Sequence, residues 1–117
     1  MRAKAEIIRE VEELAASGID AVFVDLRSLR PLDDSTILGS VRSTRRVVIV
    51  DEGWKSGSLA AEIGMSIAEN AFFELDAPLR RVCAREVPIP YAAHLENAAL
   101  PQAADVVAAV RGLVGPR

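Results

Sequence analysis

Two short apolar runs, at residues 19–26 and 47–50, constrain the fold of this chain more than any other feature. Both runs place apolar side chains on the two faces of an extended chain. A strand of this kind must be covered on both sides, which is the situation of strands in a parallel sheet between helical layers. The sequence therefore predicts four valines in a central sheet, buried on both sides by helices: Val22, Val24, Val48 and Val50.

Helical periodicity surrounds these runs. Apolar residues recur at three- and four-residue spacing over residues 3–17 and over residues 59–73. Between them, a short helix is predicted to start at a cap formed by Asp33 or Asp34. Gly18 stands where a left-handed cap would end the first helix. Pro101 is placed in the first turn of a final helix. The predicted buried stripe of that last helix is Val106, Val107, Val110, Leu113 and Val114.

A third strand is predicted over residues 79–83. Arg80 and Arg81 need exposed or paired positions, which favours the edge of the sheet. The two prolines within residues 87–91 favour an extended connector. Because a helix separates each strand from the next, the expected architecture is α/β: a single domain over residues 1–117, with three α/β/α layers around a small, mainly parallel sheet.

The charge pattern excludes some functions. Fourteen basic and 17 acidic residues give a net charge of −3, with the basic residues dispersed, which argues against a nucleic-acid partner. No signal-like or membrane-spanning apolar run is present, so we expect no membrane partner. Cys83 is the single cysteine, which fits a reducing compartment, and a cytoplasmic location is the expectation.

Motifs for self-contained chemistry are weak. Gly53 and Gly57 follow a strand and precede a helix, but they match neither a P-loop nor a dinucleotide fingerprint. Cys83 and His94 lack an evident orienting group, so structural roles are favoured over a nucleophile and its base. One histidine and one cysteine are too few for a zinc site. Trp54, in a predicted turn, is the best candidate for an interface anchor.

Four ordered motifs carry a family resemblance: VDLRSLRPLD at 24–33, VIVDEGW at 48–54, GSLAAEI at 57–63 and VPIPY at 87–91. With them, nearly the whole chain resembles the C-terminal domain of the beta subunits of thiamine-diphosphate-dependent pyruvate and related 2-oxo acid dehydrogenases, in the transketolase-like superfamily. The Pro-Tyr segment at 90–91 and the Ala-Leu-Pro segment at 99–101 resemble the pyruvate or acetoin branch more than the branched-chain branch. The resemblance implies a transketolase-like fold whose first strand is missing from this chain.

The resemblance also implies that catalysis and subunit contact belong to different domains of the parent enzyme. The domain that carries the thiamine-activating glutamate in the family is outside this sequence, so no catalytic, cofactor-binding or metal-binding residue can be transferred. The complete parent enzyme would use thiamine diphosphate and magnesium. The implied partners are a second beta chain, an alpha subunit and the peripheral-subunit-binding domain of the dihydrolipoyl acyltransferase. Asp76 matches the acidic docking position of the family, and Val114 lies near the chain end that shares that surface.

The leading expectation is therefore a non-catalytic, homo-oligomeric domain for subunit association and for docking to the acyltransferase core. The parent enzyme would catalyse oxidative decarboxylation of pyruvate. Two alternatives remain open at this point. One is the corresponding domain of acetoin dehydrogenase or another transketolase-like enzyme, and the other is a stand-alone α/β binding module. Because the first strand of the family is absent, we expect an unpaired strand edge that is covered by self-association, by domain swapping or by neighbouring molecules in a crystal.

Overall fold

The computed structural model describes residues 4–26, 32–88 and 91–114. In chain order, its elements are α1 (Lys4–Glu12), a 3-10 turn (Glu13–Ser17), α2 (Asp34–Thr44), β1 (Val48–Trp54), α3 (Leu59–Ala71), a second 3-10 turn (Phe72–Glu74), β2 (Arg80–Ala84), α4 (Ala93–Ala99) and α5 (Ala103–Val114). Within these residues, no helix has the length and apolar character needed to cross a membrane.

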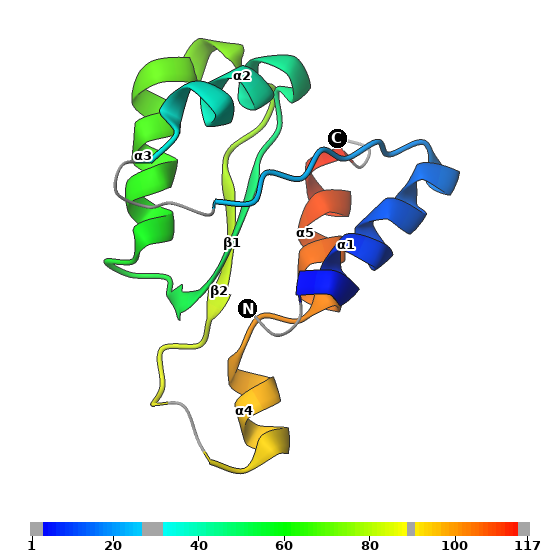
Figure 1. The fold of residues 1–117 in the computed structure, drawn as a ribbon, viewed down its shortest axis with the longest axis vertical. Helices are drawn as coiled ribbons and strands as arrows, with labels where there is room; N and C mark the ends of the chain where they lie inside the picture. The colour runs from blue at the N-terminus through cyan, green and yellow to red at the C-terminus, as the bar shows by residue number, and fades with distance from the viewer. Residues whose placement is uncertain (1–3, 27–31, 89–90, 115–117) are drawn as a thin grey trace.

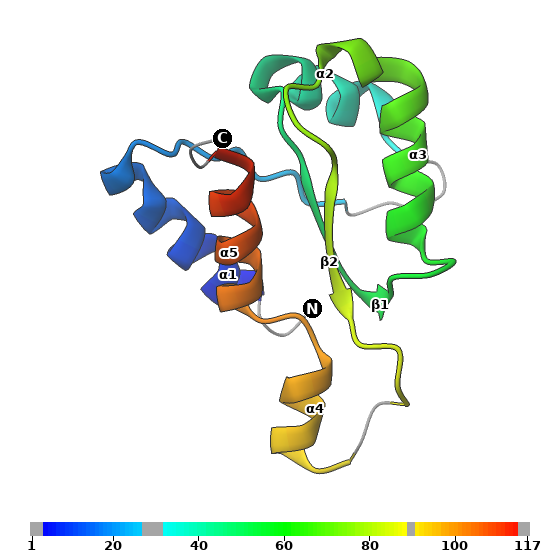
Figure 2. The ribbon, with the colours of Figure 1, turned by 180° about the vertical axis from the view of Figure 1, so that it is seen from behind.

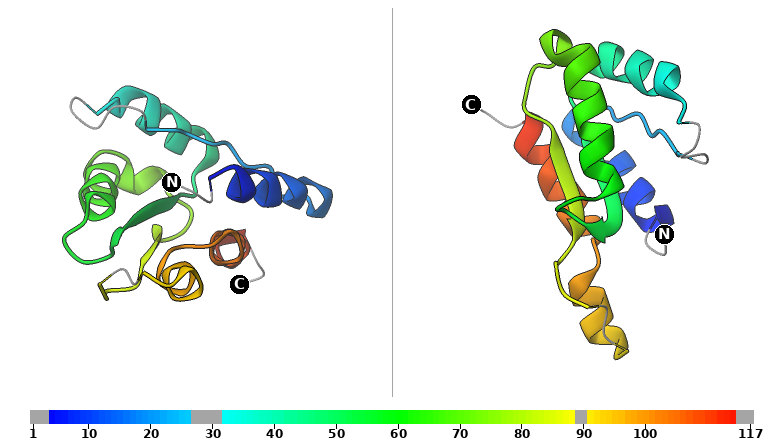
Figure 3. Two further views of the ribbon diagram at one scale, coloured as in Figure 1. Left: turned by 60° about the horizontal axis from the view of Figure 1, so that its bottom comes forward. Right: turned by 90° about the vertical axis from the view of Figure 1, so that its left-hand side faces the viewer.

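The strands and helices form three layers. β1 and β2 pair in parallel, with Val48 opposite Arg80 and Val50 opposite Val82. Helices α2 and α3 cover one face, while α1 and α5 cover the other (Figures 1 and 2). The end-on view in Figure 3 shows the strands between α3 and α5. The predicted α/β/α layering is confirmed, with two paired strands in the described residues where three were expected.

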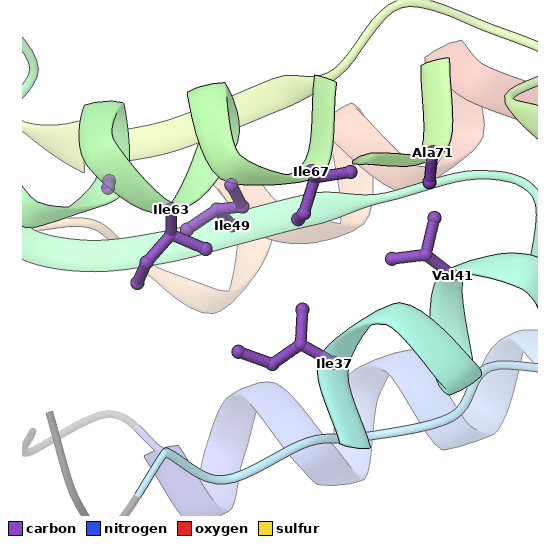
Figure 4. Packing of buried hydrophobic residues seen from close by; sticks show 7 residues of the cluster. Ile37, Val41, Ile49, Ile63, Ile67 and Ala71 are labelled. Atoms are coloured by element: carbon purple, nitrogen blue, oxygen red, sulfur yellow. The ribbon is translucent and has the colours of Figure 1, made fainter. Parts of the chain in front are cut away.

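The first hydrophobic cluster lies between α3, α2 and β1. Helical spacing on α3 directs Ala60, Ile63, Ile67 and Ala71 toward the sheet. Figure 4 shows Ile63 and Ile67 beside Ile49 of β1, with side chains of α2 facing them. Burial of these aliphatic side chains on both helices fixes this layer. The complete set of buried residues is Ile37, Val41, Ile49, Ala60, Ile63, Ile67 and Ala71.

A second cluster lies on the opposite face and joins the two ends of the chain. Ile7, Val11 and Leu14 of the N-terminal helical segment pack against Ala103 and Val106 of α5. Partly buried Val50 and Val82 extend the cluster to the sheet. Alternate side chains of the strands thus enter opposite layers, as the two-residue period of a strand requires.

Local capping residues explain where the helices begin and end. Gly18 adopts φ +83° and donates its N–H to the carbonyl of Ala15 at 3.0 Å, which is the predicted left-handed cap. Asp33, rather than Asp34, is the N-cap of α2, because its side chain accepts the N–H of Thr36 at 3.1 Å. Hydrogen bonds from Thr36 and then from Ser35 lower the pKa of the Asp33 carboxyl.

The prediction of a strand over residues 19–26 is wrong. The segment is assigned no strand, and Val22 and Val24 are 63% and 39% exposed rather than buried. Ile19 and Ala21 pack against the α1–α5 cluster, whereas Leu26 packs against the α2–α3 cluster. The segment therefore passes from one layer to the other, and its apolar residues serve both layers without a paired strand beside them.

Val48 and Val50 do lie in the sheet as predicted, although they are partly rather than fully buried. β1 also continues beyond the predicted end, through Trp54, after an irregularity in the ladder between Asp51 and Trp54. β2 occupies the predicted edge position. Two residues of β1, Glu52 and Gly53, lie between the partners of the consecutive residues Cys83 and Ala84, and extra residues of this kind change the direction of the side chains that follow them.

Helix α4 was not predicted. This helix contains good helix formers. The carbonyl of Ala99, its last residue, accepts a hydrogen bond from the backbone N–H of Arg85 at 2.8 Å. Pro101 precedes α5 by two residues instead of lying within its first turn. The predicted connector at 87–91 is neither helix nor strand where it is described, while Ile89 and Pro90 lie outside the described residues.

Candidate docking surface

The three residues predicted to contact partners do not share one surface. Asp76 follows α3, and Val114 ends α5, at the end of the domain where the parallel strands begin. Trp54 ends β1 at the opposite end, marked by the arrowhead of β1 in Figure 1. The geometry therefore places Asp76 and Val114 at one end of the sheet and separates both from Trp54.

Asp76 connects the end of α3 to the end of α2. Its Oδ1 accepts a hydrogen bond from Arg45 Nε at 3.1 Å, and its backbone N–H donates to the Arg45 carbonyl at 2.8 Å. Arg45 caps α2 with φ 66°, a left-handed conformation that is uncommon for a residue with a side chain. Since both side chains are well exposed, the ion pair itself contributes little to stability.

A second ion pair supports the same junction. Arg42 Nε, in the last turn of α2, lies 3.0 Å from Oε2 of Glu74. Together with Arg45 and Asp76, these residues place two acidic and two basic side chains side by side where α2 meets the segment after α3. The surface is thus mixed in charge rather than acidic alone.

The end of α5 joins this junction through Arg46. Its Nε donates to the carbonyl of Leu113 in the last turn of α5 at 3.2 Å. Arg45 thus binds Asp76, and the next residue, Arg46, binds the end of α5. A cation at the C-terminal carbonyls of a helix is electrostatically favourable. The prediction that Val114 belongs to the buried stripe of α5 is wrong, because Val114 is 40% exposed. Its exposure leaves it available for contact.

Phe72 and Phe73 were missed by sequence reasoning. They lie in the 3-10 turn just before Asp76, with ring centroids 5.4 Å apart and planes at 81°. Phe73 is 93% exposed. The signal in the sequence was an aromatic pair directly after the apolar stripe of α3, where helical spacing no longer directs side chains inward. An exposed aromatic pair next to charged groups is typical of contact surfaces.

Trp54 lies beside a turn whose amides are occupied by the protein's own carboxylates. Asp51 accepts the N–H groups of Gly53 at 2.9 Å and of Ala60 at 3.3 Å. Glu86 accepts the N–H of Ser56 at 3.0 Å, and the hydrogen bonds from Ser56 lower its pKa. A phosphate cradle needs such amides for its ligand, so this geometry supports a structural turn. Trp54 itself is 49% exposed.

Cys83 does not have the environment of a nucleophile. Burial, followed by the negative charge of Asp51, raises the pKa of the Cys83 thiol, which disfavours the reactive thiolate. Cys83 lies in β2 and His94 in α4. Across the described ranges, no group of three histidine, cysteine or acidic side chains could hold a metal ion. The raised pKa agrees with the structural role favoured for Cys83.

Comparisons with known proteins identify the domain. Residues 4–106 match the family model described as the C-terminal domain of transketolase. The mitochondrial pyruvate dehydrogenase E1 component subunit beta-1 of Arabidopsis thaliana is 49% identical over 102 residues, which are 87% of this chain and 28% of that protein. The corresponding subunit beta of Dictyostelium discoideum is 42% identical over 110 residues, covering 94% of this chain and 31% of that protein.

A third relative is the pyruvate dehydrogenase E1 component subunit beta of Rhizobium meliloti, which is 44% identical over 106 residues, covering 91% of this chain and 23% of that protein. The chain thus spans less than a third of the length of these relatives. The family match extends from α1 into α5 and includes both strands. This α/β chain belongs to the transketolase C-terminal domain family and is similar to the beta subunits of the pyruvate dehydrogenase E1 component.

Proposed function

We propose that this chain serves as a subunit-association and docking domain of a thiamine-diphosphate-dependent pyruvate dehydrogenase. The observation that carries the proposal is the 42–49% identity to beta subunits over nearly the whole chain. In this proposal the complete enzyme performs oxidative decarboxylation of pyruvate, and this domain joins a second beta chain and an alpha subunit. The third proposed partner is the peripheral-subunit-binding domain of the acyltransferase.

The proposal assigns thiamine diphosphate and magnesium to other parts of the parent enzyme. Magnesium prefers clustered oxygen ligands, and the side chains of residues 4–26, 32–88 and 91–114 form no group suited to a metal ion. The described residues therefore do not fit the metal that accompanies the cofactor.

We expect the purified 117-residue chain neither to bind thiamine diphosphate with magnesium nor to decarboxylate pyruvate. Isothermal titration calorimetry with the cofactor and magnesium tests binding, and carbon dioxide release from pyruvate tests activity. Adding a candidate alpha subunit provides the comparison sample. Stoichiometric cofactor binding by the chain alone would contradict the proposal that the cofactor binds to other parts of the parent enzyme.

Docking is assigned to the junction around Asp76. The proposed partner is a basic domain, which a half-exposed carboxylate attracts, and exposed Phe73 and Val114 lie at the same end of the sheet. The neighbouring Arg45 holds the carboxylate in a fixed position. The charge of Asp76 would then steer the encounter, while the apolar side chains supply buried area.

Replacing Asp76 with alanine in a complete beta subunit should weaken binding of the acyltransferase's binding domain about tenfold, as removal of one charged hydrogen-bonding partner predicts. The wild-type affinity should fall as salt rises. Surface plasmon resonance at two salt concentrations measures both effects. Because the Arg45–Asp76 pair is exposed, the melting temperature should change little.

Glu62→Ala is the matched control, since it removes the same charge from an exposed position on α3. It should leave docking affinity unchanged. If Asp76→Ala lowers the melting temperature by several degrees and leaves docking intact, Asp76 serves only to tie α2 to α3, and the docking assignment is wrong.

Self-association is proposed for the apolar segment that passes between the layers. Val22, Phe23 and Val24 are consecutive in the chain and all three are exposed, and exposed apolar side chains that gather on a surface are common contact sites. We expect Phe23→Ser to shift the chain toward the monomer, as measured by sedimentation velocity. Tyr91→Ser, at another exposed aromatic, is the control. A wild-type chain that stays monomeric at high concentration would refute the proposal.

The proposed cellular location remains a cytoplasmic one. The Arabidopsis relative is named as mitochondrial, whereas the Rhizobium meliloti relative carries no such word in its name. Fractionation of cells that express the tagged chain, followed by immunoblotting, tests the location.

A further inference from the structure

The outer edge of β2 borders a cavity of about 380 Å³. Lys55, Arg80 and Arg81 line it from the β1–α3 turn and from β2, and Ala108, Ala109 and Gly112 line it from α5. The small side chains of α5 leave room there, since a Cβ added at Gly112 would meet no atom within 4 Å. The cavity therefore combines a strand edge, three cations and open space.

The edge also carries backbone donors. β2 pairs with β1 on one side, and in the described residues no strand pairs with its other side. The N–H of Arg80 points toward β1, because it donates to the carbonyl of Val47 at 3.2 Å. In a parallel ladder the direction alternates from residue to residue, so the N–H groups of Arg81 and Cys83 point outward. These two amides can pair with an added strand.

The charge beside this edge is positive on a chain whose net charge is −3. The cavity lining contains two arginines and a lysine and no carboxylate. Arg81 is held in place, because its Nη1 donates to the carbonyl of Lys55 at 2.6 Å. Arg80 and Arg81 are consecutive residues of β2, so their side chains project from opposite faces of the sheet and place positive charge on both sides of the strand edge. A second copy of β2 would bring like charges together, which disfavours self-pairing.

We propose that the outer edge of β2 binds an acidic, extended segment of a partner protein, which adds to the sheet as a further strand. Main-chain hydrogen bonds to Arg81 and Cys83 would supply register. Glutamate or aspartate side chains of the segment would pair with Lys55, Arg80 and Arg81. The lining of this cavity starts at Arg80, at the end of the sheet that also carries Asp76 and Val114, but it contains neither of these two residues. The proposal therefore rests on other side chains than the docking role of Asp76.

The test uses a fluorescein-labelled hexapeptide of alternating valine and glutamate with the full 117-residue chain. Fluorescence anisotropy should show saturable binding. Hydrogen exchange should slow at the amides of Arg81 and Cys83. Lys55→Gln and Arg80→Gln should each weaken binding about three- to fivefold, the effect of one partly exposed ion pair. Arg9→Gln, which removes the same charge from an exposed position on α1, should have no effect.

Two further peptides separate strand addition from simple charge attraction. An alternating valine–lysine peptide should not bind. A valine–glutamate peptide that is N-methylated at alternate residues keeps its charge but loses strand hydrogen bonding, and it should bind at least tenfold more weakly. Equal binding of the methylated peptide, an equal loss with Arg9→Gln, or no binding of the parent peptide would each overturn the proposal.

Discussion

Replacement of Ile67 with alanine should lower the free energy of unfolding by about 3 kcal/mol, within the range measured for large-to-small changes in buried cores. Ile67 is 2% exposed and lies at the centre of the cluster between α3, α2 and β1 (Figure 4). The change removes apolar burial and leaves a cavity that the surrounding helices cannot fully close. Chemical denaturation followed by circular dichroism measures the effect.

Met65→Ala is the control for this prediction. Met65 lies on the same helix two residues away and is 56% exposed, so its removal should cost less than about 0.5 kcal/mol, as for ordinary surface changes. The melting temperature of Ile67→Ala should fall by more than about 10 °C, given the small size of the domain. Similar losses for the two variants would show that α3 does not present Ile67 to the core.

Val11→Asp should release α1 from the domain. Val11 is buried against α5, and the described residues include no buried polar or charged side chain that could pair with a carboxylate there. An unpaired buried charge costs about 3–5 kcal/mol. Because the α2–α3 cluster lies on the other face of the sheet, that layer should stay folded while α1 detaches.

Hydrogen exchange resolved by peptide measures the release. Exchange should accelerate in α1 and in the facing part of α5, while protection persists in β1 and α3. Ala5→Asp adds the same charge at an exposed position of α1 and should leave exchange unchanged. Uniform loss of protection across the whole chain would show instead that the two clusters unfold as one unit.

The features that could be predicted from sequence depend on neighbouring residues. Gly18 ends the 3-10 turn that follows α1, because only local geometry decides a left-handed position. Asp33 caps α2 because its carboxylate reaches an amide three residues away. The periodicity of α3 correctly placed Ile63 and Ile67 inside. Motif order likewise indicated the family, since each motif is a contiguous segment.

The features that could not be predicted depend on distant partners. An apolar run such as residues 19–26 favours an extended chain, but strand pairing also needs a neighbour, and here the run is divided between two hydrophobic clusters. Residue type alone does not reveal that Arg45 would hold Asp76, because the two lie 31 positions apart. The edge position of β2 was predictable because its arginines exclude a buried strand.

The packing of α1 on α5 affects how the domain acquires its structure during synthesis. Within this domain, α1 is synthesised before α5, yet the surface that buries Ile7 and Val11 is formed by Ala103 and Val106 of α5, about 90 residues later in the chain. The apolar face of the nascent helix therefore stays uncovered while almost the whole domain is being translated. During that interval the contacts with α5 cannot protect this face from aggregation, and binding of a chaperone can.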